Sequence, residues 1–299
     1  MNNTLFRLAI FTCVVAPLLA PLSASALETL GRIRETQTIV IAYREGSMPF
    51  SFVDDNKQVR GYSVELCVRL AEAVKRELKL PKLAIQYLAV DSKTRFSAII
   101  EGKADLECGS TTNNADRRTR VAFTVPHFYS SVRALVRANE GIRNWPNLRD
   151  KIVVTTKSTT TIKLLNDRNN VQALNIKLLE GDSDLDSFTM VEQRKADVFA
   201  MDDVLLYGLR AEAKNPAGFE VIGDPLSIEP YSIMLRKDDP AFKKLVDTEM
   251  VRLIIDGDIY KIYDRWFMKP FGARNVNMKM PMGYVLRDSF RFPTDKVGD

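Results

Sequence analysis

Histidine and cysteine are scarce in this chain, which has one histidine and three cysteines among its 299 residues. Protein metal centres are commonly built from clusters of histidine, cysteine and carboxylate side chains. No histidine–cysteine cluster occurs in the sequence, so we expect neither a metal nor another cofactor. General acid–base catalysis relies most often on histidine. The single histidine, His127 in the segment VPHFYSS, is expected to be a packed or exposed structural residue, and the composition favours a non-catalytic protein.

The chain also lacks an apolar run long enough to cross a membrane. Its most apolar stretch, Leu8–Leu22, is short and is interrupted by Pro17 and Pro21, whereas a membrane-spanning helix needs about 20 apolar residues. Directly after it, Ala24-Ser25-Ala26 has the small-x-small pattern of a signal peptidase cleavage site. We therefore expect residues 1–26 to be a cleaved signal peptide and the mature protein to be periplasmic.

No strong excess of either charge is present. Residues 1–26 carry Arg7 as their single charged residue, so the remaining 273 residues hold 42 Lys and Arg against 38 Asp and Glu. A net charge of +4 spread along the chain argues against a nucleic-acid-binding surface. No internal repeat or low-complexity segment is evident, and the length allows two lobes of ordinary domain size.

The three cysteines divide between two regions. Cys13 lies inside the signal peptide, and the preceding Phe11-Thr12 is a poor lipoprotein signal, so no lipid anchor is expected. Cys67 and Cys108 remain in the mature chain, where an oxidising periplasm makes them a disulfide candidate. Both occupy apolar-face positions of their predicted elements, so two buried free thiols are an equally open interpretation.

Strands and helices alternate along the first part of the mature chain. Strands are predicted at Thr38–Ala42, Leu83–Leu88 and Asp105–Cys108. Helices are predicted at Val64–Lys79, whose apolar residues recur at helical spacing, and at Arg95–Glu101, which is followed by a glycine. This alternation is typical of an α/β fold with a largely parallel sheet, helices on both faces and ligands at the carboxyl ends of the strands.

A second α/β unit follows, between two extended segments. Its predicted strands and helices, in chain order, are Ile152–Thr155, Thr161–Asn166, Ile176–Leu179, Asp186–Arg194 and Asp197–Met201. The flanking segments Ser131–Val136 and Tyr231–Leu235 are predicted to be two crossings between lobes. We therefore predict a discontinuous outer lobe (27–131 and 231–299), an inserted inner lobe (132–230) and a ligand cleft between them.

The segment ADLECGSTTNNADRRTRVAF, residues 104–123, has the pattern of an anion site. A short strand is followed by a turn at Gly109 and by Ser110 and Thr112, and Arg117 lies in the first turns of a predicted helix. Backbone N–H groups and hydroxyls at such a place bind oxyanions, and arginine grips a carboxylate through two hydrogen bonds. The alternative is a solvated turn followed by a basic helix. The segment contains donors but no nucleophile–base pair, which suits binding rather than catalysis.

Five segments carry a resemblance to a known family: YREGSMPFSF (43–52), ECGSTTNN (107–114), DSF (186–188), MDDVLL (201–206) and MLRKDDPAFKKL (234–245). Over essentially the whole mature chain, the protein resembles the periplasmic solute-binding proteins of family 3, the amino-acid receptors of bacterial ABC importers. Among these it is most similar to the glutamate/aspartate-binding proteins. The resemblance implies a type II periplasmic binding fold, in which two Rossmann-like lobes joined by two hinge strands close around one amino acid. It also implies a monomer that delivers L-glutamate or L-aspartate to an inner-membrane permease.

By this resemblance, one end of the cleft holds the α-carboxylate of the ligand. Arg117 would clasp it, helped by Ser110 and Thr112, because a planar guanidinium matches a carboxylate in two parallel hydrogen bonds. Thr159 and Thr160, at a predicted helix N-terminus of the inner lobe, would add donors from the opposite side of the cleft.

The resemblance also implies an acceptor for the α-ammonium group and a subsite for the ligand side chain. Asp202, at the end of a predicted strand, would bind the ammonium group. Arg44, Ser92 and Arg95 match the positions that hold the side-chain carboxylate. Asp184 departs from the family pattern, in which a histidine contacts the ligand side chain, and an acid there would repel a ligand carboxylate.

A count of formal charges bears on this departure. Arg44, Arg95 and Arg117 contribute +3, and Asp184 and Asp202 contribute −2. The predicted pocket therefore sums to +1, which a dicarboxylic amino acid would neutralise. A neutral amide ligand would leave a buried net charge, which is costly. Glutamate or aspartate is therefore the first prediction, and glutamine or asparagine is the alternative.

Two further functions would use the same scaffold. Some proteins that resemble this chain in fold are periplasmic dehydratases of small carboxylic acids, which need a general acid or base in the cleft. The nearest candidates are His127, Glu45 and Glu107, and strand alternation predicts that both glutamates point away from the pocket. A ligand-sensing partner of a chemoreceptor or sensor kinase would share the pocket. Turnover of a bound acid would indicate the enzyme, whereas stoichiometric binding without product would indicate a receptor.

Overall fold

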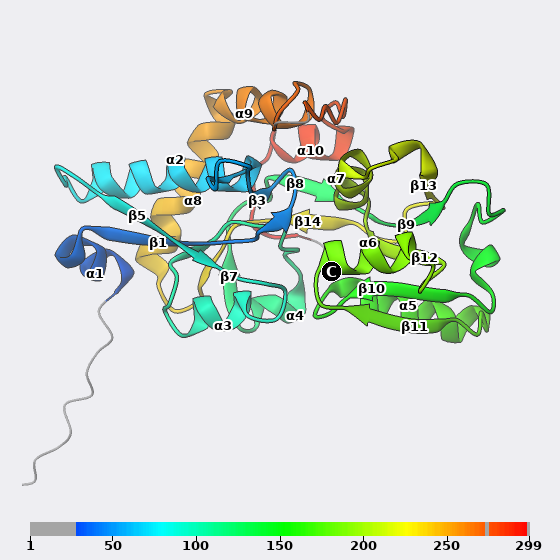
Figure 1. Ribbon diagram of the computed structural model, residues 1–299. Coiled ribbons are helices and arrows are strands. Elements are labelled where there is room, and N and C mark those ends of the chain that lie inside the picture. The colour runs from blue at the N-terminus through cyan, green and yellow to red at the C-terminus, as the bar shows by residue number, and fades with distance from the viewer. Residues whose placement is uncertain (1–27, 273–274, 298–299) are drawn as a thin grey trace, which may run out of the picture.

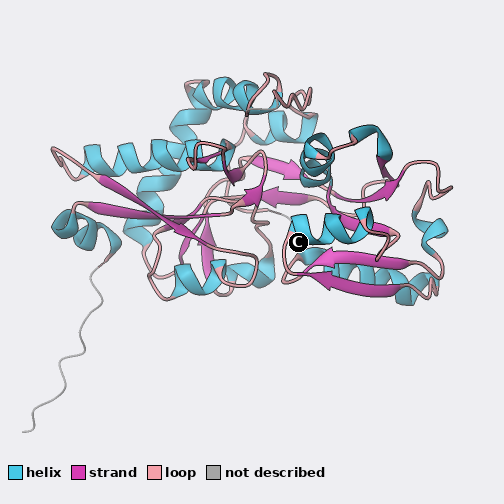
Figure 2. Cartoon of the chain, viewed as in Figure 1, coloured by secondary structure: helices cyan, strands magenta, loops and turns pink. Residues whose placement is uncertain are grey.

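The computed structural model describes residues 28–272 and 275–297, so the predicted signal peptide at 1–26 and Cys13 lie outside the described residues. Two bodies lie side by side, and each is built on a five-stranded sheet (Figure 1). Helices cover both faces of each sheet (Figure 2).

The first body, on the left of Figure 1, has the strand order β5-β1-β6-β15-β7. Its strands are β1 (Thr38–Tyr43), β5 (Ala84–Ala89), β6 (Leu106–Glu107), β7 (Val121–Phe123) and β15 (Met234–Arg236). Its helices are α1 (Thr29–Thr36), α2 (Tyr62–Glu77), α3 (Arg95–Ile100), α4 (Ala115–Arg118), α8 (Pro240–Ile255), α9 (Asp258–Phe267) and α10 (Tyr284–Ser289). A small sheet beside α2 contains β2 (Gly46–Ser47), β3 (Ser51–Val53) and β4 (Val59–Arg60).

The second body, on the right, has the strand order β11-β10-β12-β9-β13. Its strands are β9 (Val132–Arg137), β10 (Ile152–Thr156), β11 (Lys177–Gly181), β12 (Val198–Asp202) and β13 (Phe219–Ile222). Its helices are α5 (Thr160–Gln172), α6 (Asp184–Glu192) and α7 (Asp203–Glu212), with short 3-10 helices at Trp145–Leu148 and Pro216–Gly218.

Each sheet is largely parallel, as predicted, but contains one reversed strand that the prediction did not foresee. In the first sheet β1 pairs in parallel with β5 and β6, but β15 pairs antiparallel with β6 and β7. In the second sheet β10 pairs in parallel with β11 and β12, but β9 pairs antiparallel with β12 and β13. The segments predicted as crossings, Ser131–Val136 and Tyr231–Leu235, extend into β9 and β15, so that prediction is displaced by a few residues. The chain crosses between the bodies just before them, at residues 128–130 and 229–231, and β9 and β15 therefore enter their sheets from the opposite direction.

Alternation along β1 explains how one strand serves two layers of core. Ile39 and Ile41 belong to the apolar cluster that contains Leu66 and Leu70 of α2. Ala42 belongs to the separate cluster on the α3 side of the sheet. Because successive strand residues point to opposite faces, the nearly continuous apolar sequence of β1 is required by helices on both sides.

The crossings meet in an aromatic cluster. The strands β8 (Phe128–Ser130) and β14 (Glu229–Tyr231) pair antiparallel and run between the two sheets. The Phe50 ring makes edge-to-face contacts with the Phe128 ring (5.0 Å between centroids) and with the Tyr231 ring (5.1 Å). Such pairs stabilise by more than the area that they bury, so the crossings are anchored in the core of the first body.

Cys67 and Cys108 form a disulfide that joins α2 to the end of β6, with 6.3 Å between their Cα atoms. Both residues are buried, as their predicted apolar-face positions imply. Of the two interpretations left open by the sequence, the structure therefore shows the disulfide and not two free thiols. The bond lies directly before the loop that begins at Gly109. It therefore ties that loop to a long helix of the first body.

His127 is buried beside this core. Its ring packs against Phe50 and Tyr62, and its Nε2 lies 3.4 Å from the Ser63 hydroxyl. Burial lowers the pKa of His127 to about 3, so the ring is neutral at ordinary pH. The expectation of a packed structural histidine agrees with this position.

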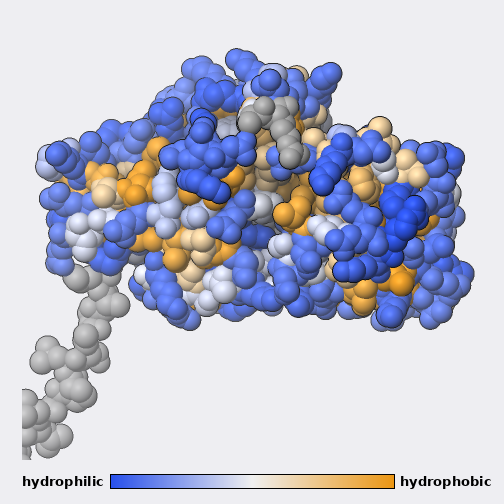
Figure 3. Space-filling model, in the orientation of Figure 1, coloured by the Kyte–Doolittle hydropathy of each residue, from blue (hydrophilic) through white to orange (hydrophobic). Residues whose placement is uncertain are grey.

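Figure 3 shows hydrophilic residues over most of one face, with apolar residues in scattered patches on both bodies. Within residues 28–272 and 275–297, none of the helices has both the length and the apolar character that crossing a bilayer requires.

We expect the disulfide to contribute strongly to stability. The bonded cysteines are 41 residues apart in sequence, and closing a loop of this size in the unfolded chain corresponds to about 4 kcal/mol. Urea denaturation should show this loss for Cys67→Ala/Cys108→Ala relative to the oxidised protein. Reduction of the unsubstituted protein should produce the same loss, and equal stability of all three forms would contradict the prediction.

His127 should make stability depend on acid pH. Its pKa is depressed in the folded chain relative to its ordinary value of 6.5, so its contribution is complete above about pH 6.5 and is lost as the pH falls toward 3. Between about pH 6.5 and pH 3, lowering the pH should reduce the unfolding free energy of His127→Gln less than that of the unsubstituted protein. The two slopes should differ by up to about 1.4 kcal/mol per pH unit. Denaturation at several pH values measures both slopes, which should differ.

Candidate functional site

Strand ends and helix starts from both bodies meet around one small cavity. It has a volume of about 10 Å³ and is lined by Arg44, Ser92, Arg95, Ser110, Thr112, Arg117, Thr159, Thr160, Met201 and Asp202. A cavity of this size holds about one water molecule, so the side chains of the two bodies pack closely around it. Nine of the ten residues predicted from the sequence line it, and the tenth, Asp184, contacts one of them.

Arg117 is positioned by a short helix. The side chain of Asn114 accepts a hydrogen bond from the Arg117 backbone N–H at 2.9 Å and so caps α4. The Arg117 guanidinium donates to the Thr112 carbonyl at 2.9 Å and lies over the Phe96 ring, 5.3 Å from its centroid. Burial lowers the pKa of Arg117, and nearby acids, Glu229 foremost, oppose that shift.

Arg95, the first residue of α3, reaches the same cavity. Its Nη1 donates to the Thr111 hydroxyl at 2.7 Å, and that hydroxyl donates to Glu107 Oε2 at 2.6 Å. Its Nε has no hydrogen-bond partner among the described residues. Burial, followed by repulsion from Arg117 and Arg44, lowers the pKa of Arg95. A guanidinium in this position strongly favours an additional negative charge nearby.

Arg44 follows β1, and its side chain extends to the boundary between the bodies. Its Nη2 donates to the Ser92 hydroxyl at 3.1 Å and lies 3.9 Å from Asp184 Oδ2. Asp184 is the first residue of α6 and belongs to the second body. The pair therefore joins the two bodies at the edge of the cavity.

The second body presents the start of α5 to the cavity. Thr159 is the N-cap residue and Thr160 the first helical residue, and both line the cavity. The first N–H groups of a helix lack intrahelical partners and carry partial positive charge. This 13-residue helix therefore adds anion-binding donors opposite Arg117, at the place that the sequence predicts.

Asp202, the last residue of β12, supplies an acceptor. The Tyr231 hydroxyl donates to its Oδ2, while its buried Oδ1 has no partner among the described residues. Burial, together with repulsion from Glu229, raises the pKa of Asp202 well above its usual range. A cation placed against Oδ1 would satisfy the unpaired oxygen and relieve the repulsion.

Two buried acids, Glu107 and Glu229, lie behind the cavity wall, and sequence reasoning missed the second of them. Glu107 lies outside the cavity lining, as strand alternation predicts, but it is buried and linked to Arg95 through Thr111. Glu229 of β14 is also buried and accepts a hydrogen bond from the Thr160 hydroxyl at 3.1 Å. No local pattern marks Glu229, because its burial depends on the pairing of β14 with β8.

These two acids correct the charge count. With Glu107 and Glu229 included, three arginines face four carboxylates, so the formal sum is −1 rather than the predicted +1. The raised pKa of Asp202 favours its neutral form, which brings the sum to zero. The net charge of these groups therefore does not by itself favour a dicarboxylic ligand.

The arrangement offers groups of both signs to a zwitterion. Arginine and hydroxyl groups of the first body and the start of α5 in the second body line the cavity together, and an unpaired carboxylate oxygen lies within the same cavity. His127 is absent from the lining residues. Glu45 is exposed and lines a different groove, so neither side chain is placed as a general acid or base for a molecule in the cavity.

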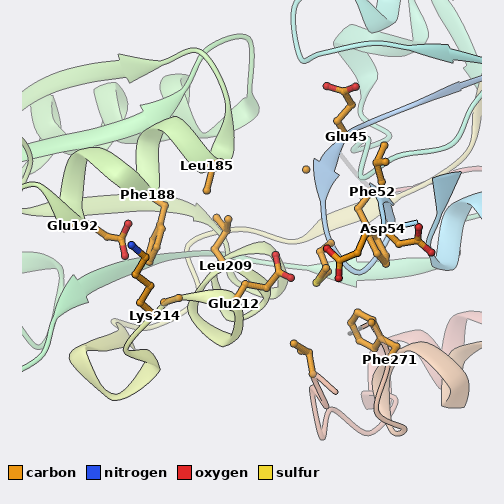
Figure 4. Close-up of a pocket in the computed structure, with 17 residues that line it drawn as sticks. Glu45, Phe52, Asp54, Leu185, Phe188, Glu192, Leu209, Glu212, Lys214 and Phe271 are labelled. Carbon is orange, nitrogen blue, oxygen red and sulfur yellow. The ribbon is translucent and has the colours of Figure 1, made fainter. Parts of the chain in front are cut away.

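That groove, of about 530 Å³, lies at the outer edge of the boundary between the bodies (Figure 4). Phe52 and Phe271 line it from the first body, and Leu185, Phe188 and Leu209 from the second. Its charged lining residues are Glu45, Asp54, Asp55, Glu192, Glu212 and Lys214. With five acids and one lysine, it does not suit an anionic ligand, and the arginine cavity remains the candidate site.

Known proteins resemble this chain over most of its length. The family model of bacterial extracellular solute-binding proteins, family 3, matches residues 39–269. An L-glutamate/L-aspartate-binding protein of Pseudomonas aeruginosa is 40% identical over 292 residues, 96% of each chain. A glutamate/aspartate import solute-binding protein of Escherichia coli is 39% identical over 273 residues, which is 91% of this chain and 90% of the relative.

Solved structures agree in fold. A solute receptor for L-cysteine from Neisseria gonorrhoeae superposes with a TM-score of 0.71 at 23% sequence identity, covering 80% of this chain and 93% of that chain. This similarity of fold agrees with the predicted architecture of two lobes. The chain belongs to the bacterial extracellular solute-binding proteins, family 3.

Proposed function

We propose that this protein is the periplasmic substrate-binding component of an ABC amino-acid importer and that it binds L-glutamate or L-aspartate. The observation that carries the proposal is the cavity in which three arginines face the unpaired oxygen of Asp202. The proposal is supported by relatives of about 40% identity that are named for glutamate and aspartate binding. The predicted signal peptide supports a periplasmic location, and a monomer suits a diffusing receptor.

Each group of the ligand has a partner of opposite character in this proposal. The α-carboxylate is held by Arg117, with Ser110, Thr112 and the start of α5 as further donors. The α-ammonium group binds Asp202. The remaining lining residues, Arg44, Ser92 and Arg95, hold the side-chain carboxylate.

Binding occurs in this proposal by closure of two lobes, 27–131 with 231–299 and 132–230. Across this boundary Lys93 Nζ lies 2.7 Å from Asp182 Oδ1. A Cβ added to Gly208 of α7 would lie 2.8 Å from the Met48 carbonyl oxygen, so the absence of a side chain there permits close approach. A ligand that contacts both lobes favours the closed state, and this state is then presented to the permease.

A receptor accounts for the site better than an enzyme. A dehydratase would need a general acid or base in the cleft, and His127 is buried outside the cavity with a strongly lowered pKa. One observation favours a second ligand class, the amides glutamine and asparagine. Asp184 lies beside Arg44, where a carboxamide could donate a hydrogen bond and a carboxylate could not.

Isothermal titration of the mature protein, stripped of bound ligand by unfolding and refolding, tests the proposal. Glutamate, aspartate, glutamine and asparagine are titrated separately. One-to-one binding of glutamate or aspartate as the tightest ligand supports a dicarboxylate receptor. A preference for the amides establishes the second ligand class, and binding of none of the four contradicts both.

Two arginine substitutions should have different consequences. Arg117→Ala removes the contact to the group that every amino acid has, so all ligands should bind at least about a hundredfold more weakly. Arg95→Ala should weaken glutamate and aspartate while sparing ligands without a side-chain carboxylate. Titration calorimetry of both variants with all four amino acids measures this difference.

Arg120→Ala is the matched control, since Arg120 lies over the same Phe96 ring but its side chain is half exposed and pairs with Asp116. Its affinities should equal those of the unsubstituted protein. Full binding of glutamate by Arg117→Ala would contradict the assignment of the pocket.

Gly208→Ala should hinder closure without touching the pocket. Overpacking of a close contact typically costs about 1–3 kcal/mol, so affinity should fall roughly 5- to 150-fold. The loss should be similar for every ligand, because all of them depend on the same closure. A selective loss for one ligand, or an unchanged affinity, would show that the contact with Met48 is not limiting.

A further inference from the structure

Asp184 enters the cleft from the lobe opposite to the arginines. Its Oδ2 lies 3.9 Å from Arg44 Nη2, and both residues are less than 8% exposed. Asp184 also exerts an attractive electrostatic effect on Arg95, which carries repulsion from Arg44 and Arg117. One carboxylate of the protein thus interacts with Arg44 and Arg95, the two guanidinium groups that would also bind the side-chain carboxylate of the ligand.

The local structure holds Asp184 in this place. Ser183 caps α6, and its hydroxyl accepts the backbone N–H of Asp186, so Asp184 begins the helix. The Thr156 hydroxyl donates to Asp184 Oδ1 at 2.7 Å and lies 3.3 Å from the Ser187 hydroxyl. One carboxylate oxygen is therefore fixed by the second lobe, which leaves the other facing Arg44.

The pair also lies at a boundary between two spaces. Arg44 lines both the small arginine cavity and an outer cavity of about 450 Å³, and Asp184 lines the outer one. A ligand side chain that extends from the α-carboxylate site toward Arg44 therefore ends close to Asp184. A terminal carboxylate there meets a like charge, whereas a terminal carboxamide can accept from Arg44 and donate to Asp184.

We propose that Asp184 is a specificity-determining residue that competes with the ligand for Arg44 and so weakens the binding of dicarboxylic amino acids relative to their amides. This inference rests on the proposed amino-acid receptor function. Asp184 is an internal counter-ion of Arg44, and a ligand carboxylate that reaches Arg44 must displace it or remain close to a like charge.

Asp184→Asn tests the inference with little change of shape, because an asparagine oxygen can still accept the Thr156 hydroxyl. Titration calorimetry with glutamate, aspartate, glutamine and asparagine should show dicarboxylate affinity raised at least about tenfold. The affinity for the amides should be unchanged or lower. Asp182→Asn is the control: Asp182 is exposed, contacts Lys93 of the other lobe and Lys157 of its own lobe, and lines the outer cavity but not the arginine cavity, so its loss should affect all ligands alike.

A double-mutant cycle tests whether Asp184 acts through Arg44. In an Arg44→Gln background, Asp184→Asn should raise dicarboxylate affinity by less than in the unsubstituted protein. The inference is overturned if Asp184→Asn changes all four affinities equally or none, or if its effect persists in full without Arg44. If the unsubstituted protein binds none of the four amino acids, the receptor proposal fails first and this inference fails with it.

Discussion

Three guanidinium groups buried around one small cavity impose the constraint on which the rest of this structure depends. Arg44, Arg95 and Arg117 lose hydration there and repel one another. The chain offsets this cost with buried carboxylates, among them Glu107 behind the cavity wall, and with the face of the Phe96 ring, which lies within 5.4 Å of two of the guanidinium carbons. The groups around the cavity are thus nearly balanced in charge, but the hydrogen-bonding capacity of the guanidinium groups is only partly used, and a small anionic ligand would complete it.

The two bodies contribute different groups to the cavity. The first supplies the arginines from loops and helix starts that follow parallel strands, and the disulfide ties one of those loops to α2. The second supplies a helix terminus and Asp202. The aromatic core around Phe50 holds the paired crossings β8 and β14 in the first body, and Tyr231 of that core donates to Asp202. A change in the angle between the two bodies would therefore act directly on Asp202.

The sequence is informative where local geometry determines position. Ser110, Thr112 and Arg117 follow one strand within a few residues, so their convergence is predictable from the order of strand, turn and helix. Arg44 and Arg95 lie far apart in the chain, and only the resemblance to a family brought them together in advance. The burial of Glu229 was unpredictable because it depends on the pairing of two distant crossings, and the antiparallel strands in both sheets arise from the same long-range feature. The roles of these residues toward a ligand stay predictions.

The enclosure of the cavity has a consequence for rates. Eight of the ten predicted site residues are no more than 7% exposed, namely Arg44, Ser92, Arg95, Ser110, Thr112, Arg117, Asp184 and Asp202. While the two bodies stay together, these residues would screen a molecule held among them from most of the solvent. Its dissociation would then depend on how often the two bodies separate, in addition to the contacts that it makes. Ligands that bind with different strength would then differ mainly in how often an opening event lets them escape.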